Sequence, residues 1–465
     1  MKRLAKNITA IGGSDLTRKL FGFLSVTYLT RHISVSDFGI VNLGFTVFSY
    51  ILILGAAGLP SLGTREIARS SERSFIGDIL FTRILLTLLI LIVTTIGVSV
   101  FVTNPIIAAI IILISVTAIP NALFLDWYFQ GKESMSFIGF ARSIGAIVNF
   151  CVIYFFVKSS QQLIWVAFAA IASDVSSCII YFIFARNEFS KTTYSFQFKK
   201  VISLLKQALP LGVGSILAHA SINLAPIVIG IILTTHSVGL FSAAFKLVFF
   251  LMMFDRVLAT LLLPATSRIY TQQPAQFLIQ LREAQKWVLI LCVPLCVGGT
   301  ILSADVIGLV FGTNYMEAAP IFSILLWFVL LTMVHTVFNA GLVATGNEKA
   351  YAQVMMISSI LYFSFIIIGT LVYGAIGAAI GFIASEIISV LLSRNRLQQI
   401  IEMNLPDKTI QILLSAAVMA LSIVLLPHIP LLFAIAVGAI IYGIATFTFR
   451  AITLQELQTL SKRMM

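Results

Sequence analysis

The sequence predicts an all-α integral membrane protein with about fourteen transmembrane helices, a fold class that three observations indicate. Of the 465 residues, 59% are hydrophobic and only 10% are charged. Apolar segments of spanning length, roughly 20 residues, follow one another from near residue 10 to near residue 449. The basic residues gather between alternate segments. A soluble globule of this composition would be covered by apolar surface, so the solvent of this chain is lipid.

The apolar segments place each predicted helix in chain order, and they leave no room for a soluble domain. The basic amino end is not followed by a small-residue cleavage site, so the first segment is expected to stay in the membrane. The predicted helices cover residues 10–31, 38–59, 77–103, 105–128, 136–157, 162–185, 206–232, 237–263, 283–303, 318–344, 350–373, 374–395, 408–427 and 429–449.

The placement of Lys and Arg predicts the orientation of these helices. When the breaks are assigned alternately to two sides, nearly all basic residues fall on one side, including Arg83 and Arg142. The other side receives only Arg31 and Lys158. Four basic residues lie inside the predicted helices, namely Arg18, Lys19, Lys246 and Arg256. By the positive-inside rule, both termini are expected in the cytoplasm.

Three short segments occur twice in the same order, which indicates an internal duplication. The matching pairs are Asp37–Gly39 with Ser237–Gly239, Gln130–Glu133 with Thr345–Lys349, and Ile171–Ser177 with Ile383–Ser389. Because each copy holds an even number of helices, both copies enter the membrane in the same direction, and the repeat is parallel.

The duplication predicts two six-helix lobes around a central cavity and a carboxyl-terminal helical hairpin. The amino-terminal lobe is expected at 1–190 and the carboxyl-terminal lobe at 206–397, joined by a cytoplasmic linker at 191–205. Residues 398–465 are expected to supply two extra transmembrane helices and a cytoplasmic tail.

Several function classes are excluded by what the sequence contains. A net charge of +12 would suit nucleic acid only if the basic residues shared one exposed face, and their alternate placement argues against such a partner. The motifs H-E-x-x-H, G-x-x-x-x-G-K-[ST] and G-x-S-x-G do not occur, so ATP hydrolysis by this chain is not expected, and we predict a protein that is not an enzyme. We predict no metal site and no cofactor beyond a coupling ion, H⁺ or Na⁺.

Ionised residues in the first predicted helix are candidate site residues, because such groups usually face a bundle interior or a wet cavity. Asp15, Arg18 and Lys19 stand at i, i+3 and i+4, hence on one helix face. One interpretation is an anion site on a central cavity. The alternative is a local salt bridge with Lys19 extending toward the membrane surface.

The eighth predicted helix carries a second group of ionised residues. Asp255 can neutralise Arg256 locally, but Lys246 has no acid within a turn of its own helix. Lys246 is therefore expected to meet an acidic side chain from elsewhere or a bound anion. For Arg256, anchoring at the cytoplasmic surface is an equal alternative.

Asp174 and Glu386 occupy equivalent mid-helix positions in the two lobes. A buried carboxylate can bind and release protons as its surroundings change, which predicts ion coupling. The alternative is a structural hydrogen bond to a neighbouring serine. His219 and His335 lie in the seventh and tenth predicted helices, either in a polar cavity or as interhelical hydrogen bonders.

The openings of the two predicted lobes resemble those of a known family. The likeness is carried by Tyr28–Gly39, Gly55–Pro60, Thr64–Arg69 and Val238–Leu247. These segments resemble the Wzx-type flippases for O-antigen and other lipid-linked oligosaccharides, members of the multidrug/oligosaccharidyl-lipid/polysaccharide (MOP) exporter superfamily. The similarity extends in order over the first twelve predicted helices.

The resemblance implies a transporter of the prokaryotic inner membrane. Its cargo would be undecaprenyl-diphosphate-linked sugar repeat units, moved to the outer leaflet by alternating access, with membrane lipids, a polysaccharide polymerase and chain-length machinery as partners. The residues expected in a cationic substrate cavity are Asp15, Arg18, Lys19, Arg31, Lys246 and Arg256. Those expected to bind the coupling ion are Asp174, Asp255 and Glu386, and those of a polar cavity are His219 and His335.

Three other functions remain open from the sequence. A lipid II flippase is compatible with fourteen helices. A cation-coupled drug exporter would favour buried acids, whereas the first and eighth predicted helices hold more bases than acids. A membrane glycosyltransferase or polymerase would need a catalytic group in a sizeable loop, and the largest predicted outer break, 304–317, holds only Asp305 and Glu317.

Overall fold

A computed structural model describes residues 2–69, 74–189, 198–401, 408–426, 429–453 and 456, and the regular structure in these ranges is helical. The chain divides into two compact units, Met1–Gly239 and Leu240–Met465. Each of the fourteen predicted ranges overlaps a helix. The predicted all-α fold class is therefore confirmed.

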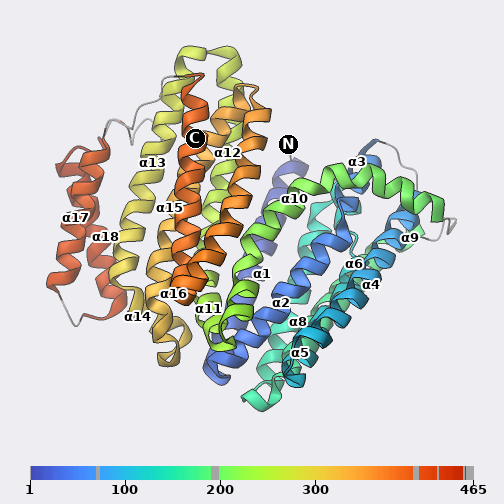
Figure 1. Cartoon of the computed structure of the whole chain (residues 1–465). Helices are drawn as coiled ribbons and strands as arrows, with labels where there is room; N and C mark the ends of the chain where they lie inside the picture. Colours follow the sequence, from blue (N-terminus) through green and yellow to red (C-terminus); the bar gives the residue numbers. More distant parts are fainter. Residues whose placement is uncertain are drawn as a thin grey trace. The chain divides into compact units, whose positions relative to one another are not determined.

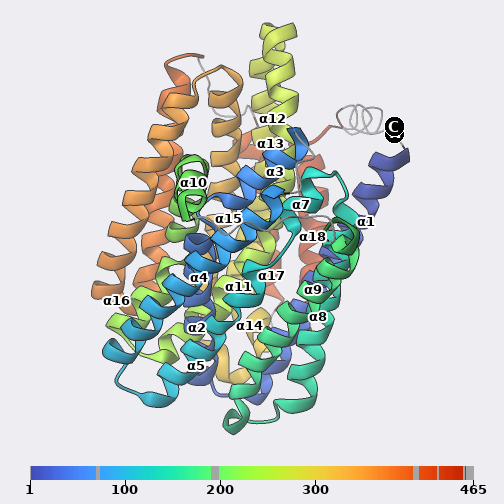
Figure 2. The same cartoon turned by 90° about the vertical axis from the view of Figure 1, so that its right-hand side faces the viewer.

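The first unit contains ten helices in the residues that the structure describes, and the start of an eleventh (Figure 1). These are α1 (Lys2–His32), α2 (Val35–Ala56), α3 (Leu59–Arg69), α4 (Ser74–Phe101), α5 (Pro105–Val116), α6 (Ala118–Ala122), α7 (Asp126–Gly131), α8 (Met135–Phe156), α9 (Ile164–Phe189), α10 (Phe198–Ile232) and α11 (Thr235–Leu251). Helices α1, α8 and α9 run side by side, with α8 in contact with both others (Figure 2).

The second unit takes in the rest of α11 and seven further helices among the described residues. These are α12 (Met253–Gln272), α13 (Pro274–Ile301), α14 (Ser303–Phe311), α15 (Ala319–Ala344), α16 (Glu348–Gln398), α17 (Thr409–Leu425) and α18 (Leu431–Thr448). Helix α15 packs on α12, α13 and α16, and α13 also contacts α17. The α15 helix is thus the centre of this unit.

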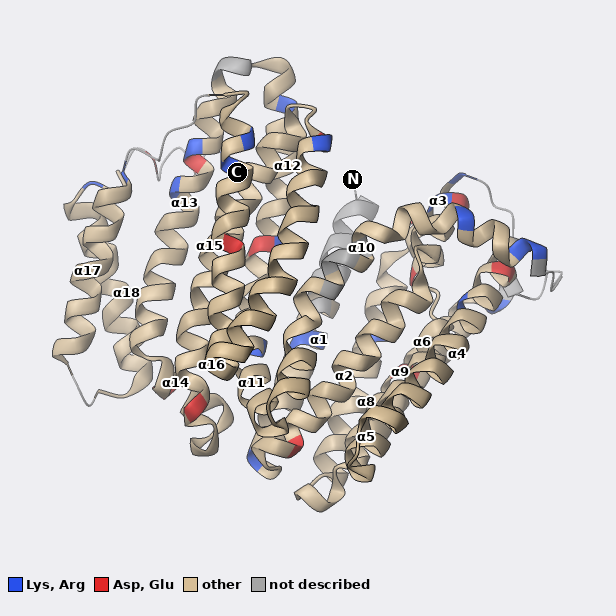
Figure 3. Ribbon diagram, in the orientation of Figure 1, with Lys and Arg blue, Asp and Glu red and all other residues tan. Residues whose placement is uncertain are grey.

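Length and composition show a multi-pass membrane protein. In the described ranges, ten helical segments are long and apolar enough to cross a bilayer. Lys and Arg gather toward one end of the helices within each unit, around α3 in the first and around the adjoining ends of α12 and α13 in the second (Figure 3). The number of fourteen crossings and the cytoplasmic termini stay predictions.

The core of the first unit surrounds α3, a helix that the sequence analysis did not predict. Leu59 and Leu62 of α3 pack with Trp127 of α7, Tyr181 of α9 and Ala208 of α10, all of which are buried. Because only one face of α3 is apolar, this short helix does not show as a spanning segment. It lies on the predicted break between the second and third helices.

Two predicted helices are divided in the structure, and one predicted break contains helices. The range 105–128 is interrupted, because it contains α5, α6 and α7 with Pro120 inside α6, although Pro105–Gly131 as a whole is long and apolar enough to cross a bilayer once. The range 237–263 is split between α11 and α12 at Met252. The break 304–317 contains most of α14 and of a 3₁₀ helix, Thr313–Ala318.

Helix α16 is a helical hairpin. Its backbone leaves the helical conformation at Tyr373 and at Gly374, whose φ of 63° and ψ of −142° are open almost only to glycine. A Cβ on Gly377 would lie 1.8 Å from the carbonyl oxygen of Gly369, and one on Gly381 would lie 2.4 Å from that of Phe365. The two halves therefore run antiparallel with their backbones in contact, as small residues allow. The predicted boundary between residues 373 and 374 is confirmed.

Helix α10 packs in the first unit, although the sequence analysis placed residues 206–232 in the second lobe. It contacts α2 and α3, and a Cβ on Gly212 would lie 2.6 Å from the backbone nitrogen of Gly58. Such a close approach requires glycine at both positions. Residues 191–197 of the predicted linker 191–205 lie outside the described residues, and residues 198–205 belong to α10. The two-lobe repeat stays a prediction.

Candidate functional site

A polar cavity of about 260 Å³ lies inside the first unit. Helices α1, α6, α8 and α9 surround it, and one residue of its wall lies in the connection from α6 to α7. The lining residues are Arg18, Gly22, Asn121, Phe124, Arg142, Ala146, Asn149, Ser173, Asp174 and Ser177. Guanidinium, carboxylate, amide and hydroxyl groups thus meet in a segment of the chain that spans the membrane.

Helical spacing explains why these residues share one cavity. On α8, Arg142, Ala146 and Asn149 follow at i, i+4 and i+7, which places them on one face. The same face of α8 meets α9 closely, because a Cβ on Gly145 would lie 2.2 Å from the hydroxyl oxygen of Ser177. Ser177 donates a hydrogen bond across this contact to the carbonyl oxygen of Ala141 at 3.1 Å.

Asp174 is held by an amide rather than by a serine. The Nδ2 of Asn121 donates to the Oδ2 of Asp174 at 2.9 Å. Its neighbour Ser173 instead accepts hydrogen bonds through its backbone carbonyl from Ser176 and Ser177. The expected alternative of a structural bond to a neighbouring serine is therefore wrong for Asp174, since its observed partner comes from α6.

Arg142 forms an ion pair with Asp126, and the carboxylate of Asp126 also accepts a hydrogen bond from the hydroxyl of Tyr181. The three residues belong to α8, α7 and α9, so the network ties the short helix α7 to the two long ones. A charge-assisted bond of this kind orients a guanidinium more firmly than a neutral partner would. Arg142 is therefore presented to the cavity in a fixed position.

Arg83 supports the same region from α4. Its side chain is buried, and it donates to the carbonyl oxygens of Phe124 at 2.9 Å and of Asn121 at 3.2 Å. These carbonyls lie where the chain leaves α6. The Asn121 carbonyl oxygen also accepts from the Phe124 backbone N–H at 3.0 Å, so Arg83 is its second donor. The planar guanidinium supplies two donors at once. Arg83 thus stabilises the helix break that carries Asn121 into the cavity wall.

Arg83 and Arg142, which the sequence analysis assigned to breaks on the cytoplasmic side, lie inside helices α4 and α8. Each also stands six residues inside its predicted helix, at 77–103 and 136–157, which is roughly 9 Å at 1.5 Å per residue. Backbone carbonyls and Asp126 supply the partners that make this depth tolerable. Depth within the predicted helix was therefore the signal that could have found both residues.

The charges around the cavity are nearly balanced. Arg18 and Arg142 bring two guanidinium groups, Asp174 brings a carboxylate, and Asp126 neutralises Arg142 from behind. Lys19, although next to Arg18, is not among the lining residues. Successive residues leave an α-helix about 100° apart, so the two cations point in different directions.

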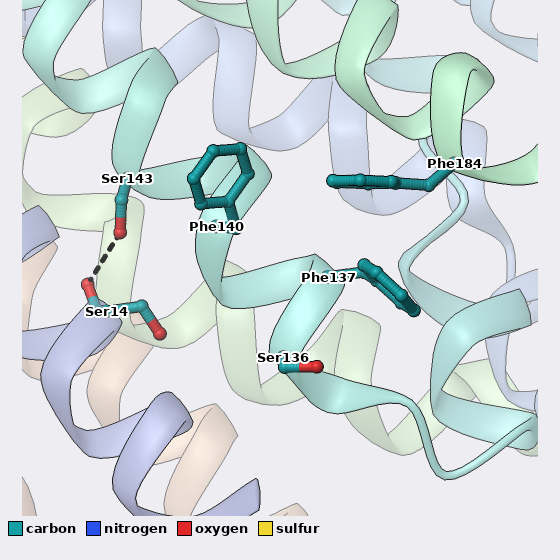
Figure 4. Close-up of a pocket in the computed structure, with 6 residues that line it drawn as sticks. All are labelled: Ser14, Ser136, Phe137, Phe140, Ser143 and Phe184. Atoms are coloured by element: carbon teal, nitrogen blue, oxygen red, sulfur yellow. Dashed lines mark hydrogen bonds between the residues drawn. The ribbon is translucent and has the colours of Figure 1, made fainter.

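A second hollow of about 430 Å³ lies between α1, α8 and α9, one turn before Arg18 along α1. The rings of Phe137, Phe140 and Phe184 face it, and Ser143 donates to the carbonyl oxygen of Ser14 at 3.3 Å (Figure 4). Because its wall is largely aromatic, this hollow suits apolar groups.

The second unit contains a buried network around Glu386. The Nδ1 of His335 lies 2.9 Å from Glu386 Oε1, and the hydroxyl of Tyr362 donates to the other carboxylate oxygen. On the other side of the imidazole, His335 Nε2 lies 2.9 Å from Ser393 Oγ, which itself donates to Asn339 Oδ1. His335 and Glu386 are both buried. The expected bond from Glu386 to a neighbouring serine is again wrong.

His335 links Glu386 to Ser393 through its two ring nitrogens. Each ring nitrogen can donate or accept, depending on the tautomer. An imidazole and a carboxylate in direct hydrogen-bond contact form a pair that can exchange a proton.

Of the charged residues of the eighth predicted helix, Asp255 stands near this network. Lys246 is partly buried on α11, and Asp255 in the first turn of α12 accepts a hydrogen bond from Thr336 at 2.6 Å. Thr336 follows His335 on α15, so Asp255 lies close to the Glu386 network. Arg256 is exposed.

The structure places the remaining predicted residues apart from both networks. Arg31 is exposed in the last turn of α1, and His219 is exposed on α10. Lys19 is partly buried on α1, and the side chain of Asp15 lies outside the described residues. In the described ranges, no three His, Cys, Asp or Glu side chains come together as a metal would require.

A family model described as polysaccharide biosynthesis protein matches residues 4–270 of this chain. The chain belongs to the polysaccharide biosynthesis protein family. A Shigella dysenteriae relative assigned as an O-antigen transporter is 23% identical over 409 residues, which cover 83% of this chain and 98% of that protein. The resemblance that the sequence analysis found is confirmed.

Solved structures share the fold of this family member. A structure of the lipid II flippase MurJ in an inward closed conformation matches with a TM-score of 0.74 and 16% identity, covering 95% of this chain and 98% of that chain. An inward-facing multidrug resistance MATE family transporter of the MOP superfamily matches with a TM-score of 0.65 and 16% identity, covering 82% and 95%. These likenesses show the MOP superfamily fold.

Proposed function

We propose that this protein is a flippase that moves an undecaprenyl-diphosphate-linked oligosaccharide from the cytoplasmic to the outer leaflet by alternating access. The observation that carries the proposal is the polar cavity of the first unit, in a chain that belongs to a polysaccharide biosynthesis family. A hydrated sugar cannot cross hydrocarbon without such groups, whereas its lipid tail can remain in the bilayer.

The diphosphate would be bound by cations of the spanning helices. Lys19 and Lys246 are partly buried in α1 and α11, where an ammonium attracts phosphate oxygens more strongly than in water. Arg31 and Arg256 are exposed, and they would contact the diphosphate before or after it meets the partly buried lysines. Arg18 has a different surrounding, because Asp174 shares its cavity.

The coupling ion would be a proton bound by the second unit. The groups around Glu386 are an imidazole nitrogen and a phenol, which exchange protons, and they are not the set of oxygen ligands that a hard cation prefers. Asp174 of the first unit and Asp255 are further carboxylates that could bind the coupling proton.

The proposal is tested in inverted membrane vesicles by measuring how much lipid-linked glycan becomes accessible at each leaflet. The native chain is compared with Lys246→Gln and with Lys199→Gln, which removes the same charge from an exposed position at the start of α10. We expect Lys246→Gln alone to abolish translocation at equal protein levels. Translocation of lipid II in place of the oligosaccharide, or unchanged transport by Lys246→Gln, would contradict the proposal.

A further inference from the structure

We infer that the cavity of the first unit recognises a single uncharged sugar ring of the transported glycan, separately from the diphosphate. The inference rests on the proposed function and assigns the cavity a part in cargo selection. It depends on three features of the cavity, which are its charge balance, its unused hydrogen-bonding groups and its size.

The charge balance argues against a phosphate in this cavity. Arg142 is neutralised by Asp126, and the carboxylate of Asp174 stands in the same wall as Arg18. A phosphate placed here would meet the Asp174 carboxylate, and like charges in a low-dielectric site repel strongly. An uncharged polyhydroxyl group meets no such cost. Its hydroxyls both donate and accept, so they can pair with cationic, anionic and amide groups at once.

Polar groups in the wall remain available to such a ligand. Among the described residues, neither the Asn149 amide nor the Oδ1 of Asp174 has a hydrogen-bond partner. The amide can give two hydrogen bonds and accept others, and the carboxylate oxygen can only accept. Adjacent hydroxyls of a sugar ring complement this pairing. The ring of Phe124 adds an apolar surface for the C–H face of a sugar.

The size of the cavity limits the ligand to one ring. Small-molecule sites usually measure roughly 300–1,000 Å³, and this cavity of about 260 Å³ lies just below that range. A whole repeat unit would not fit. The cavity therefore distinguishes one sugar position of the cargo, and the rest of the glycan lies elsewhere.

Gly22 offers a substitution that fills the cavity without disturbing the fold. It lines the cavity on α1, and a Cβ at this position would have no heavy atom within 4 Å. A larger side chain would thus enter open space, and replacing a helical glycine by a better helix former favours the helix. Gly97 on α4 has the same open surroundings but does not line the cavity, so Gly97→Leu is the matched control.

The experiment measures binding of two kinds of lipid to the purified full chain in nanodiscs. One probe is bare undecaprenyl diphosphate. The other probes are undecaprenyl diphosphates that each carry one glucose, galactose or N-acetylglucosamine. We expect the native chain to bind at least one sugar-bearing lipid about tenfold more tightly than the bare lipid, the size of one or two good hydrogen bonds.

Gly22→Leu and Asn149→Leu are expected to lower the affinity for the sugar-bearing lipid to that for the bare lipid, and Gly97→Leu is expected to change neither. Equal affinities of the native chain for all the lipids would overturn the inference. So would a sugar preference that survives in both cavity variants. Failure of every lipid to bind the native chain would instead overturn the proposed function, so the two failures are distinguishable.

Discussion

Gly39 and Gly239 lie in reciprocal contact where α2 meets the start of α11. A Cβ on Gly39 would lie 1.8 Å from the carbonyl oxygen of Thr235, and a Cβ on Gly239 would lie 2.1 Å from that of Val35. Gly39 thus contacts the residue four positions before Gly239, and Gly239 contacts the residue four positions before Gly39. The two glycines also occupy matching positions of the repeated segments.

Replacement of Gly39 by alanine should destabilise the protein, because the added methyl group would overlap a backbone oxygen. We expect Gly39→Ala to lower the free energy of unfolding by about 1–3 kcal/mol. Thermal unfolding in detergent can be followed by the reaction of a thiol dye with the buried Cys178, Cys292 and Cys296. Gly97→Ala serves as the control, since its Cβ would meet nothing within 4 Å. Equal midpoints for the two variants would refute the close contact.

Arg83 should be needed for the break between α6 and α7. Arg83→Met leaves the carbonyl oxygens of Asn121 and Phe124 without these donors. The Asn121 carbonyl oxygen keeps its bond from the Phe124 N–H, but the Phe124 carbonyl oxygen loses its guanidinium donor. An unsatisfied buried polar group costs about 1–3 kcal/mol, so the same unfolding assay should show a clear loss of stability. Arg83→Lys keeps the charge but not the planar fork, and it should recover only part of the loss. Full recovery by lysine would mean that charge alone matters.

Glu386 should carry the proton that drives transport. Glu386→Gln keeps the size of the side chain but cannot release a proton to His335. In proteoliposomes, we expect an imposed pH gradient to accelerate translocation by the native chain and to leave the variant unchanged. Asp174→Asn is measured beside it, because the first unit offers the other mid-helix carboxylate. Acceleration of the native chain by a sodium gradient alone would count against proton coupling.

Glu456 should make the attachment of the carboxyl-terminal segment depend on pH. It accepts hydrogen bonds from Lys286 at 2.7 Å, Lys408 at 3.2 Å and the Thr453 amide at 3.0 Å. Partial burial acts to raise the pKa of Glu456, but these hydrogen bonds lower it from its ordinary value of 4.5 to about 2. Because the folded-state pKa is depressed, the stabilisation is fully present above pH 4.5 and is lost as the pH falls toward 2.

Hydrogen exchange at the Thr453 amide can measure this attachment. We expect faster exchange in Glu456→Gln than in the native chain at pH 7. The ratio of the two rates cancels the intrinsic effect of pH, and it should approach one near pH 2. A ratio of one at pH 7 would show that Glu456 does not hold the segment.

Hydrophobicity predicted most of the spanning helices because lipid demands long apolar segments. The same signal failed at 105–128, where a run of apolar residues is broken by Pro120 and held open by the Arg83 side chain from α4. A donor supplied from another helix leaves no trace in the local pattern. Helix α3 was not predicted from hydrophobicity because one of its faces is polar, so it does not form a continuous apolar segment.

The candidate site was only partly predictable. Asp174 and Glu386 could be found because an ionised residue in the middle of an apolar helix stands out. Their partners could not, since Asn121 and His335 reach them from other helices and neutral or short polar residues are common in membrane segments. Arg142 was misread because a cation near a helix end fits the membrane surface equally well.

The tight reversal inside α16 has a consequence for how the chain enters the membrane during synthesis. Between Phe365 and Gly381 the chain turns at Tyr373 and Gly374 without a single ionised residue. The turn contains no hydrophilic loop. The second half of α16 is therefore not separated from the first half by a polar segment that would cross the bilayer in a later step. The two halves would leave the translocon as one preassembled hairpin. Glu386, bonded to Tyr362 on the opposite half, would then enter lipid with its partner already in place.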